Sequence, residues 1–166
     1  MIRVGIIGGA GYTGGELLRI LVNHPNVSIV FVSSKSNSGI AVSHIHQDLL
    51  GCDLVFSDKE IDVVDVIFTC SGHGEALKYI HQVPIPKSIK IIDLGNDFRL
   101  QKDSIQGERR FVYGLPELLR ESIITAHNIA NPGCFATAIQ LGLLPLAQLG
   151  ELSEVYTTGI TGSTGA

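Results

Sequence analysis

One cysteine directly follows a proline and a glycine, in the stretch Asn131-Pro132-Gly133-Cys134. Proline fixes one backbone angle and glycine adopts conformations that other residues resist, so the pair predicts a small, rigid turn. A helix-forming run starts at or just after Cys134, and the unpaired N–H groups of a helix N-terminus favour a negative charge. A thiol held there tends to ionise, and the thiolate is the nucleophile. We therefore expect Cys134 to attack a carbonyl carbon; the alternative is a buried, inert cysteine on a core helix.

The element that would bring a reaction partner to this cysteine begins at the N-terminus. Residues 2–7 and 27–32 are apolar runs that predict buried strands, and residues 16–21 between them have helical character. The turn before the helix has the spacing G-x-G-x-x-G when it is counted from Gly9, through Gly11 and Gly14. Counted from Gly8, the same turn has the spacing G-x-x-G-x-x-G. Such glycines make a tight turn, let the backbone approach a pyrophosphate and let the helix pack on the sheet. The unit predicts a dinucleotide site; a βα turn without a ligand is the alternative.

The loop after the second predicted strand indicates which dinucleotide to expect. An NAD site usually carries an acidic residue about 20 residues past the glycines. Here the loop from Val32 to Gly39 contains no carboxylate, and it offers Ser34, Lys35 and Ser36 instead. Hydroxyl groups and a lysine can hold a 2′-phosphate, so we expect NADP(H) as the cofactor. An ordinary polar surface loop is the alternative.

A third strand, predicted at residues 63–70, is followed by Gly72 and His73. Because the carboxyl ends of parallel strands line the ligand crevice of such sheets, we expect Gly72 and its neighbours to touch the cofactor. His73 has a second interpretation, in which it only caps the helix that follows.

The next predicted strand, residues 90–94, precedes Asp97 and Arg99. Arg99 is a candidate for binding an anionic substrate, although an internal contact between Asp97 and Arg99 that shapes the loop is equally consistent with the sequence. Asn131, three residues before the cysteine, is a second candidate for substrate binding.

The C-terminal part predicts both the end of one domain and the start of another. We expect a strand at residues 123–130, a helix over residues 135–149 whose apolar side chains pack on the sheet, and a new strand at residues 155–160. The fold class is therefore α/β, a Rossmann-type, doubly wound and mostly parallel sheet in residues 1–150. Residues 151–166 would begin a truncated second α+β domain, because a strand without a partner is not stable alone.

The bulk properties exclude several classes of function. The chain has 166 residues, of which 45% are apolar and 17% charged, with a net charge of −4, so we expect a globular protein that does not bind nucleic acid. The apolar start, residues 2–10, is too short to span a membrane and lacks the flanks of a signal peptide.

The cysteines and histidines indicate neither disulfides nor a metal site. An odd number of cysteines without metal-type spacing, Cys52, Cys70 and Cys134, fits a reducing compartment, so we expect a cytoplasmic protein. His44 and His46 alternate, but no third ligand is near, so we expect both to make solvent or loop contacts and no metal to bind.

Four stretches together resemble the N-acetyl-γ-glutamyl-phosphate reductases, the arginine-biosynthesis branch of the semialdehyde dehydrogenase group: residues 8–14, 93–100, 112–118 and 130–134. The resemblance implies NADPH-dependent reduction of N-acetyl-γ-glutamyl phosphate to N-acetyl-glutamate semialdehyde through a thioester on Cys134. It assigns the NADP-binding turn to the following residues: Gly8, Gly11, Tyr12, Thr13 and Gly14. The sequence departs from the usual family pattern at Gly95-Asn96, Phe135-Ala136 and Cys70-Ser71-Gly72.

Other consequences of the resemblance concern partners and missing parts. The substrate would be a small acyl phosphate or semialdehyde, whose N-acyl group the sequence leaves open, and the full-length protein would be a homo-oligomer. The family's catalytic histidine has no counterpart here and is expected beyond residue 166, and residues 163–166 would begin an active-site loop. An aspartate-semialdehyde dehydrogenase with the same cysteine chemistry is one alternative, against which the motif at residues 113–117 argues. A non-catalytic dinucleotide-binding module is the other, if the chain is complete at 166 residues.

Overall fold

The computed structural model describes residues 1–58 and 63–162. The strands are β1 (Ile2–Ile7), β2 (Val27–Ser33), β3 (Phe56–Ser57), β4 (Val66–Thr69), β5 (Lys90–Asp93), β6 (Ile105–Gln106), β7 (Arg109–Tyr113) and β8 (Asn128–Ala130). The α-helices are α1 (Tyr12–Val22), α2 (Val42–Ile45), α3 (Glu75–Gln82), α4 (Pro116–Thr125) and α5 (Cys134–Gln148). Two short 3-10 helices are η1 (Lys35–Asn37) and η2 (Gln47–Leu49).

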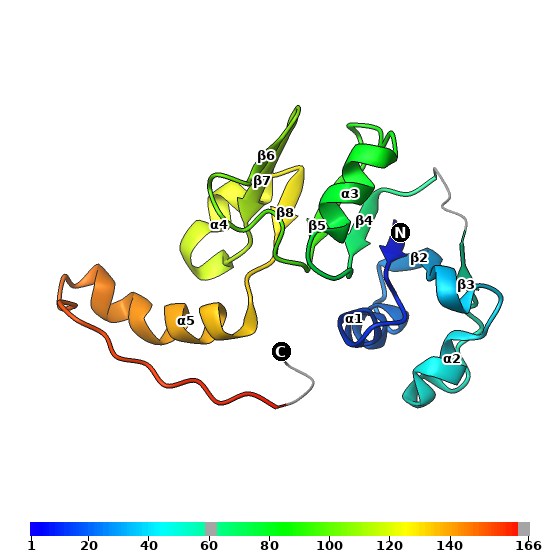
Figure 1. Cartoon of the computed structure of the whole chain (residues 1–166), viewed down its shortest axis with the longest axis horizontal. Coiled ribbons are helices and arrows are strands. Elements are labelled where there is room, and N and C mark those ends of the chain that lie inside the picture. Colours follow the sequence, from blue (N-terminus) through cyan, green and yellow to red (C-terminus); the bar gives the residue numbers. More distant parts are fainter. Residues whose placement is uncertain (59–62, 163–166) are drawn as a thin grey trace.

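The strands of the described part form one 8-stranded sheet in the order β3-β2-β1-β4-β5-β8-β7-β6 (Figure 1). Neighbouring strands are parallel from β3 to β7, and β6 joins β7 as an antiparallel hairpin. The order reverses between β1 and β4, and in open α/β sheets ligands bind outside the carboxyl ends of the strands at such a point. The doubly wound, mostly parallel α/β fold expected from the sequence is confirmed.

Helices cover both faces of the sheet. The side chains of β1 illustrate this, because they point alternately into two different buried clusters. Val4 and Ile6 are buried in one cluster together with Leu18 of α1. Ile7 belongs to a second buried cluster, against which Tyr79 of α3 packs. Figure 1 shows α1 and α3 on opposite sides of the strands. Because both faces are covered, the central strands are continuous apolar runs in the sequence, and this pattern made them predictable.

Two strands are shorter by several residues than the sequence predicted. Of residues 63–70, only Val66–Thr69 pair in the sheet, and of residues 123–130 only Asn128–Ala130 do so. The first part of the second prediction was wrong because Pro116 occupies the first turn of α4, and that helix continues to Thr125.

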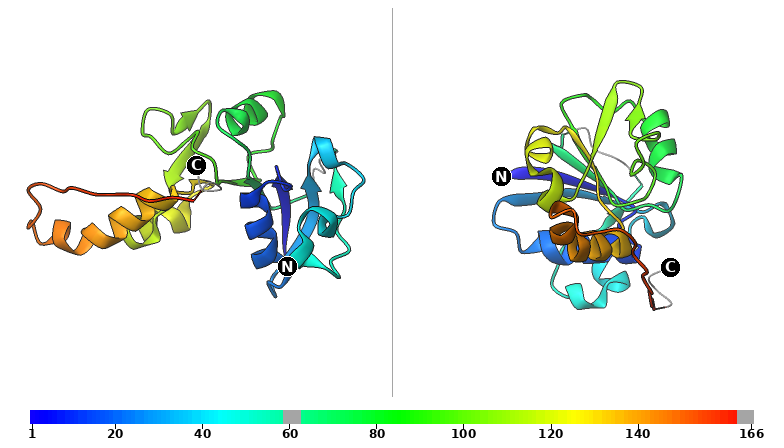
Figure 2. Two further views of the ribbon diagram at one scale, coloured as in Figure 1. Left: turned by 60° about the horizontal axis from the view of Figure 1, so that its bottom comes forward. Right: turned by 90° about the vertical axis from the view of Figure 1, so that its left-hand side faces the viewer.

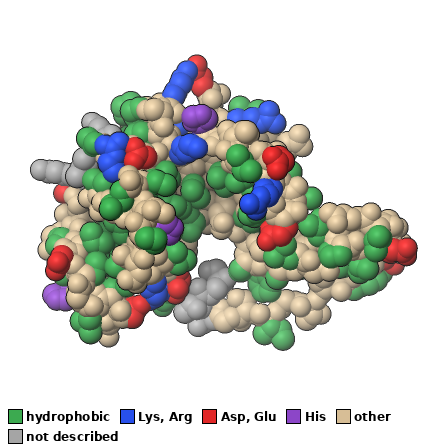
Figure 3. All heavy atoms as spheres, turned by 180° about the vertical axis from the view of Figure 1, so that it is seen from behind, with side chains coloured by type: hydrophobic (Ala, Val, Ile, Leu, Met, Phe, Trp, Pro, Cys, Tyr) green, Lys and Arg blue, Asp and Glu red, His purple; other side chains and the backbone are tan. Residues whose placement is uncertain are grey.

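Helix α5 differs most from the expectation. Its apolar side chains were predicted to pack on the sheet, but none of its residues is buried, and Ile139 and Leu146 are 38% and 45% exposed. Figure 2 shows α5 projecting away from the sheet instead of lying across it, and Figure 3 shows hydrophobic side chains exposed along it. The prediction was correct for the helix and wrong for its packing.

The segment after α5 forms neither helix nor strand over residues 151–162, so the strand predicted at residues 155–160 was wrong. A strand needs a neighbour for its backbone hydrogen bonds, whereas this segment runs back alongside α5 (Figures 1 and 2). A Cβ on Gly159 would lie 2.7 Å from the ring of Phe135, at the start of α5. Residues 163–166 lie outside the described residues, and the domain division at residue 150 stays a prediction.

Candidate active site

The glycine turn starts where β1 ends and is bonded to the end of β2. The N–H groups of Gly8 and Gly9 donate to the carbonyl oxygen of Ser33 at 3.1 and 3.0 Å, and Gly11 N–H donates to Gly8 O at 3.3 Å. Gly11 is the N-cap of α1, and no side chain caps this helix end. The first N–H groups of α1 can therefore bind an anion, as in phosphate sites at other helix N-termini.

Close packing explains the glycines at two positions of this turn. A Cβ on Gly14 would lie 2.6 Å from the Cα of Gly9, so a side chain there would separate α1 from the turn. Gly8 has a φ of +77°, and a Cβ on it would lie 2.9 Å from the carbonyl oxygen of Cys70. The loops after β1 and β4 are thus in direct contact. Tyr12 and Thr13, the other predicted cofactor residues of the turn, are exposed in the first turn of α1.

The predicted 2′-phosphate loop lies at the same edge of the sheet, because β2 neighbours β1 and runs parallel to it. The side-chain amide of Asn37 donates to the hydroxyl oxygens of Ser34 and Ser36, at 3.0 and 3.1 Å. Lys35 and Ser36 are exposed, and Ser34 is half-buried. The two hydroxyl groups and the lysine are therefore held in one short turn beside the glycines.

Gly72 lies in the loop after β4, where a Cβ on it would meet no atom within 4 Å. The next residue, His73, has an 81% exposed side chain, and its Nδ1 lies 2.6 Å from Oδ1 of Asn96 and 3.3 Å from Oδ1 of Asp97. The loops after β4 and β5 are therefore linked, and the backbone at Gly72 is open to a ligand.

Asp97, not His73, caps α3. Its carboxylate accepts hydrogen bonds from the N–H groups of Gly74, at 2.7 Å, and Leu77, at 3.0 Å. The interpretation of His73 as the cap was wrong, and so was that of an Asp97–Arg99 contact, because Asp97 uses both oxygens on the helix N-terminus.

The predicted nucleophile begins α5. Gly133 is the N-cap of this helix, Thr137 N–H donates to Gly133 O at 2.8 Å, and Cys134 is exposed. The preceding turn is joined to the sheet, because Asn131 N–H donates to the carbonyl oxygen of Asp93 at the end of β5, at 2.7 Å. An exposed thiol at a helix N-terminus matches the expected position, and the alternative of a buried cysteine was wrong.

Arg99 holds the same turn from the other side. Its Nε donates to the carbonyl oxygen of Asn131 at 2.8 Å, and its Nη2 donates to Leu94 O at 3.1 Å. A Cβ on Gly133 would lie 3.0 Å from Nη1 of Arg99, so the guanidinium lies against the backbone just before the cysteine. Arg99 and Asn131, the two predicted substrate residues, are therefore brought together beside Cys134.

The segment after β7 supports the turn and α5. Gly114 N–H donates to Ala130 O at 2.8 Å, and a Cβ on Gly114 would lie 2.7 Å from a methyl group of Ile129. The hydroxyl oxygen of Tyr113 accepts a hydrogen bond from the side-chain amide of Gln140 in α5, at 3.2 Å. Tyr113 and Gly114 thus have a structural role. Gly114 is bonded to the end of β8, and Tyr113 is bonded to the helix that begins with the cysteine.

Asp93 is a buried acid that the sequence reasoning did not single out. It is fully buried at the end of β5, and its Oδ1 accepts a 2.6 Å hydrogen bond from the hydroxyl of Thr69. Burial raises the pKa of its carboxyl group, against the hydrogen bonds from Thr69 and Gly95. Burial, and then the Asp93 charge, raises the pKa of the Cys70 thiol to about 12. A thiol with a raised pKa is less ionised near neutral pH, which makes Cys70 a weaker nucleophile than an ordinary cysteine.

His46 makes one of the two kinds of contact that the sequence predicted. Its side chain is only 8% exposed, so a solvent contact was wrong, but its Nε2 lies 2.8 Å from the carbonyl oxygen of Gly9 in the loop after β1. The two residues are 37 positions apart, so no local sequence pattern predicts this contact and only the folded structure shows it.

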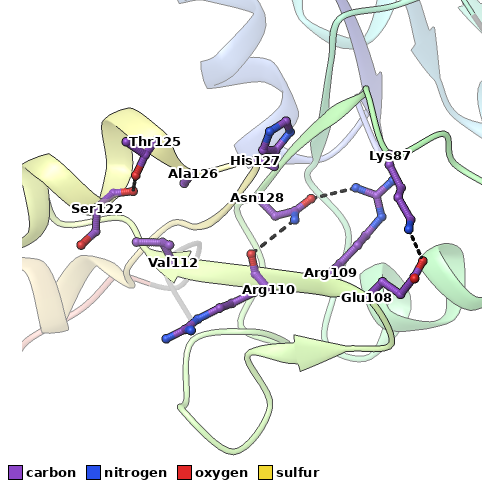
Figure 4. A pocket seen from close by; sticks show the side chains of 10 residues that line it. All are labelled: Lys87, Glu108, Arg109, Arg110, Val112, Ser122, Thr125, Ala126, His127 and Asn128. Atoms are coloured by element: carbon purple, nitrogen blue, oxygen red, sulfur yellow. Dashed lines mark hydrogen bonds and ion pairs between the residues drawn. The ribbon is translucent and has the colours of Figure 1, made fainter.

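A separate depression of about 570 Å³ lies near the opposite edge of the sheet, where β7 and β8 begin (Figure 4). Arg109 crosses it and donates to Oδ1 of Asn128 at 2.9 Å and to the carbonyl oxygens of Ile85, at 2.8 Å, and Pro86, at 2.9 Å. These bonds fasten β7 to the loop before β5. The depression is distant from the strand ends that carry the glycine turn, and Arg109 is a structural residue.

The described residues contain neither a metal-binding cluster nor a membrane-spanning helix. Within residues 1–58 and 63–162, no group of three or more His, Cys, Asp or Glu side chains is arranged to hold a metal ion. In the same ranges, no helix combines the length and the apolar character that crossing a membrane requires.

Comparisons with known proteins agree with this geometry. The chain is 52% identical to the N-acetyl-gamma-glutamyl-phosphate reductase of Bacteroides fragilis, over 100% of this chain and 51% of that protein. It is 55% identical to the protein of the same name from Azobacteroides pseudotrichonymphae, over 100% of this chain and 52% of the relative. The chain thus spans about half the length of the curated relatives it matches.

The fold also matches solved structures. Aspartate semialdehyde dehydrogenase II from Vibrio cholerae superposes with a TM-score of 0.67 at 21% identity, over 89% of this chain and 47% of that one. Residues 3–126 match the model of the semialdehyde dehydrogenase NAD-binding domain. The match covers most of the chain, which therefore belongs to the semialdehyde dehydrogenase family.

Proposed function

We propose that the chain supplies the NADP(H) site and the nucleophile of an N-acetyl-γ-glutamyl-phosphate reductase. One observation carries the proposal: the glycine turn after β1 and the cysteine turn after β8 both follow the carboxyl ends of parallel strands in one sheet. A cofactor on the first turn and a substrate on the second would share one edge of the sheet. The roughly 50% identity to reductases of that name supports this substrate over a shorter one.

The residues at the glycine turn fit a dinucleotide. Gly8 and Gly14 leave no room for side chains, and α1 begins without a side-chain cap. A pyrophosphate would accept hydrogen bonds from the first N–H groups of α1, next to Tyr12 and Thr13. The open backbone at Gly72, across the junction between β1 and β4, would contact the same cofactor.

The loop after β2 favours NADP over NAD. It has the two hydroxyls of Ser34 and Ser36 and the ammonium of Lys35, and between Val32 and Gly39 it has no carboxylate that would repel a 2′-phosphate. A phosphate there would gain a charge-assisted contact with Lys35, which an NAD ribose cannot make.

The chemistry would start at Cys134. Its Sγ attacks the acyl carbon, the bond from that carbon to the phosphate oxygen breaks, and inorganic phosphate leaves as a thioester forms on Cys134. This covalent step divides one difficult displacement into two easier ones. When bound, NADPH supplies the hydride that reduces the acyl group. The thiolate of Cys134 is the leaving group when the aldehyde is released.

Two neighbouring residues would serve the substrate. Arg99 is half-buried against the turn, and its positive charge lies beside Gly133, where it would attract an anionic acyl phosphate. Asn131 is exposed next to it. N–H groups at the start of α5 would stabilise the oxyanion that forms during attack.

Several expectations stay predictions: a general acid/base beyond residue 166, a second domain from residue 151, a homo-oligomer and a cytoplasmic location. The substrate assignment is tested with the protein expressed from its natural gene, by following NADPH formation from NADP⁺, phosphate and either semialdehyde. We expect N-acetyl-glutamate semialdehyde to be preferred. A preference for aspartate semialdehyde would support the neighbouring enzyme class, and no turnover with either, together with NADPH binding, would support a non-catalytic module.

A further inference from the structure

His46 lies between the short helices α2 and η2, in the stretch of chain that leads to the edge strand β3. It is one of the few buried polar side chains of the described residues. Its Nε2 lies 2.8 Å from the carbonyl oxygen of Gly9, in the middle of the glycine turn. Because a carbonyl oxygen can only accept, Nε2 carries the hydrogen and donates it.

The ring also fills the space beside the turn. A Cβ on Gly15 would lie 2.6 Å from Cε1 and from Nδ1 of His46, so the ring packs against the backbone of α1. The ring also meets Phe56 of β3 edge-to-face, with centroids 6.3 Å apart and planes at 61°. One side chain therefore contacts the turn, the helix that follows it and the outer strand.

A second contact fixes the segment that carries His46. Arg19 of α1 forms an ion pair with Asp48 of η2, and one of its hydrogen bonds, from Nη2 to Oδ1, measures 2.9 Å. The chain immediately after His46 is thus joined to α1, one turn beyond the place where the ring packs. This link helps to keep the backbone of the His46 segment beside α1.

The hydrogen bond determines which way one peptide group of the turn faces. In a trans peptide the C=O of one residue and the N–H of the next point in opposite directions. The C=O of Gly9 points to His46, so the N–H of Ala10 points away from the ring. A carbonyl oxygen turned toward a pyrophosphate would repel it, whereas N–H groups attract it.

We propose that His46 is a positioning residue of the dinucleotide site, which holds the Gly9 carbonyl away from the cofactor phosphates. This proposal rests on the proposed function, because it needs the phosphates to bind at the glycine turn. It adds a residue 37 positions from the turn, outside the glycine pattern, that prepares the turn before any cofactor arrives.

The test compares variants that distinguish the effect of the hydrogen bond to Gly9 from the effect of the packed ring. His46→Phe keeps a ring but cannot donate, and His46→Gln places an amide nitrogen close to the position of Nε2. The matched control is His44→Phe, since His44 is exposed two residues away. NADPH affinity is measured by fluorescence titration, and amide hydrogen exchange of residues 8–15 is measured by mass spectrometry without cofactor.

We expect His46→Phe to bind NADPH about fivefold to tenfold more weakly, the loss that one hydrogen bond explains. The same variant should exchange the amides of residues 8–15 faster than the wild type. His46→Gln and His44→Phe should stay within about twofold of the wild type in affinity. The KM for the acyl phosphate should not change in any of them.

If His46→Phe does not fold, His46→Gln is compared with His46→Asn, whose shorter side chain does not reach Gly9. Weaker NADPH binding by the Asn variant alone supports the proposal, and equal affinities overturn it. Wild-type affinity and wild-type exchange in His46→Phe would also overturn it. The binding of NADPH by the wild type tests the proposed function, and its absence would contradict that function. The comparison of the variants with the wild type tests the role of His46 separately.

Discussion

The guanidinium of Arg99 donates a 2.8 Å hydrogen bond from Nε to the carbonyl oxygen of Asn131. This bond joins the loop after β5 to the turn that begins α5. No residue of α5 is buried, and Gln140 of this helix donates a hydrogen bond to the hydroxyl oxygen of Tyr113 at the end of β7. Hydrogen bonds therefore fix the position of Cys134 more than buried apolar contacts do. The orientation of the thiol therefore depends on bonds to the turn, from Arg99 on one side and from the end of β5 on the other.

Replacing Arg99 tests this relationship. In Arg99→Lys a single ammonium cannot reach both Asn131 O and Leu94 O as the guanidinium does. Loss of one hydrogen bond and of the turn's alignment should lower kcat/KM at least about tenfold, while the affinity for NADPH stays within about twofold. Arg110→Lys, an exposed change at β7, is the control. Wild-type turnover in Arg99→Lys would refute the role of this contact.

The loop after β2 gives a prediction about cofactor choice. Ser34→Asp puts a carboxylate where the 2′-phosphate is proposed to bind, and at close range like charges repel by several kcal/mol. The wild type should bind NADPH more tightly than NADH, and the variant should lose NADPH affinity at least about tenfold, with less effect on NADH. Lys102→Ala removes an exposed lysine elsewhere and should change neither affinity. Equal affinities of the wild type for NADH and NADPH would show that the loop does not select NADP.

Gly14 and Gly142 form a matched pair for stability. A Cβ on Gly14 would lie 2.6 Å from Gly9 Cα, whereas one on Gly142 in α5 would meet nothing within 4 Å. Gly14→Ala should therefore lower the free energy of unfolding by about 1–3 kcal/mol, and Gly142→Ala should raise it by up to about 1 kcal/mol through helix propensity. Urea unfolding measures both. Similar effects of the two changes would argue against the close packing of α1 on the turn.

Asp93 predicts a pH dependence of stability. Its pKa is raised above the ordinary value of 3.8, mainly by burial, so ionisation is harder in the folded than in the unfolded protein. Below pH 3.8 the carboxyl group is protonated in both states and its ionisation costs no stability. As the pH rises above that value, the unfolded state loses the proton first, so the free energy of unfolding of the wild type falls. Asp93→Asn lacks this loss, so the unfolding free energy of the variant relative to wild type should increase as the pH rises above that ordinary value. A constant or decreasing difference in urea titrations would contradict the assignment.

Features with a local pattern were predictable from the sequence. The strands β1 and β2 are apolar runs, and the glycine spacing and the Pro-Gly pair describe turns within a few residues. The position of Cys134 at the start of a helix was predicted correctly, because the residues that precede and cap that helix are its direct neighbours in the sequence.

Contacts between distant residues were not predictable. Asp97 caps α3 from 20 and 23 residues away, and His46 reaches Gly9 across 37, so neither has a local signature. The apolar residues of α5 gave the correct helix but not its neighbours, because periodicity identifies an apolar face and not the surface that covers it.

Peptide mass mapping shows whether Cys134 forms the proposed thioester. The protein expressed from its natural gene is mixed with N-acetyl-γ-glutamyl phosphate without NADPH, quenched in acid and digested, with Cys134→Ser as the control. We expect the peptide carrying Cys134 to gain the mass of the acyl group while phosphate is released, and peptides carrying Cys52 or Cys70 to be unchanged. An unmodified Cys134 in a protein that reduces the substrate when NADPH is added would contradict the proposed thioester.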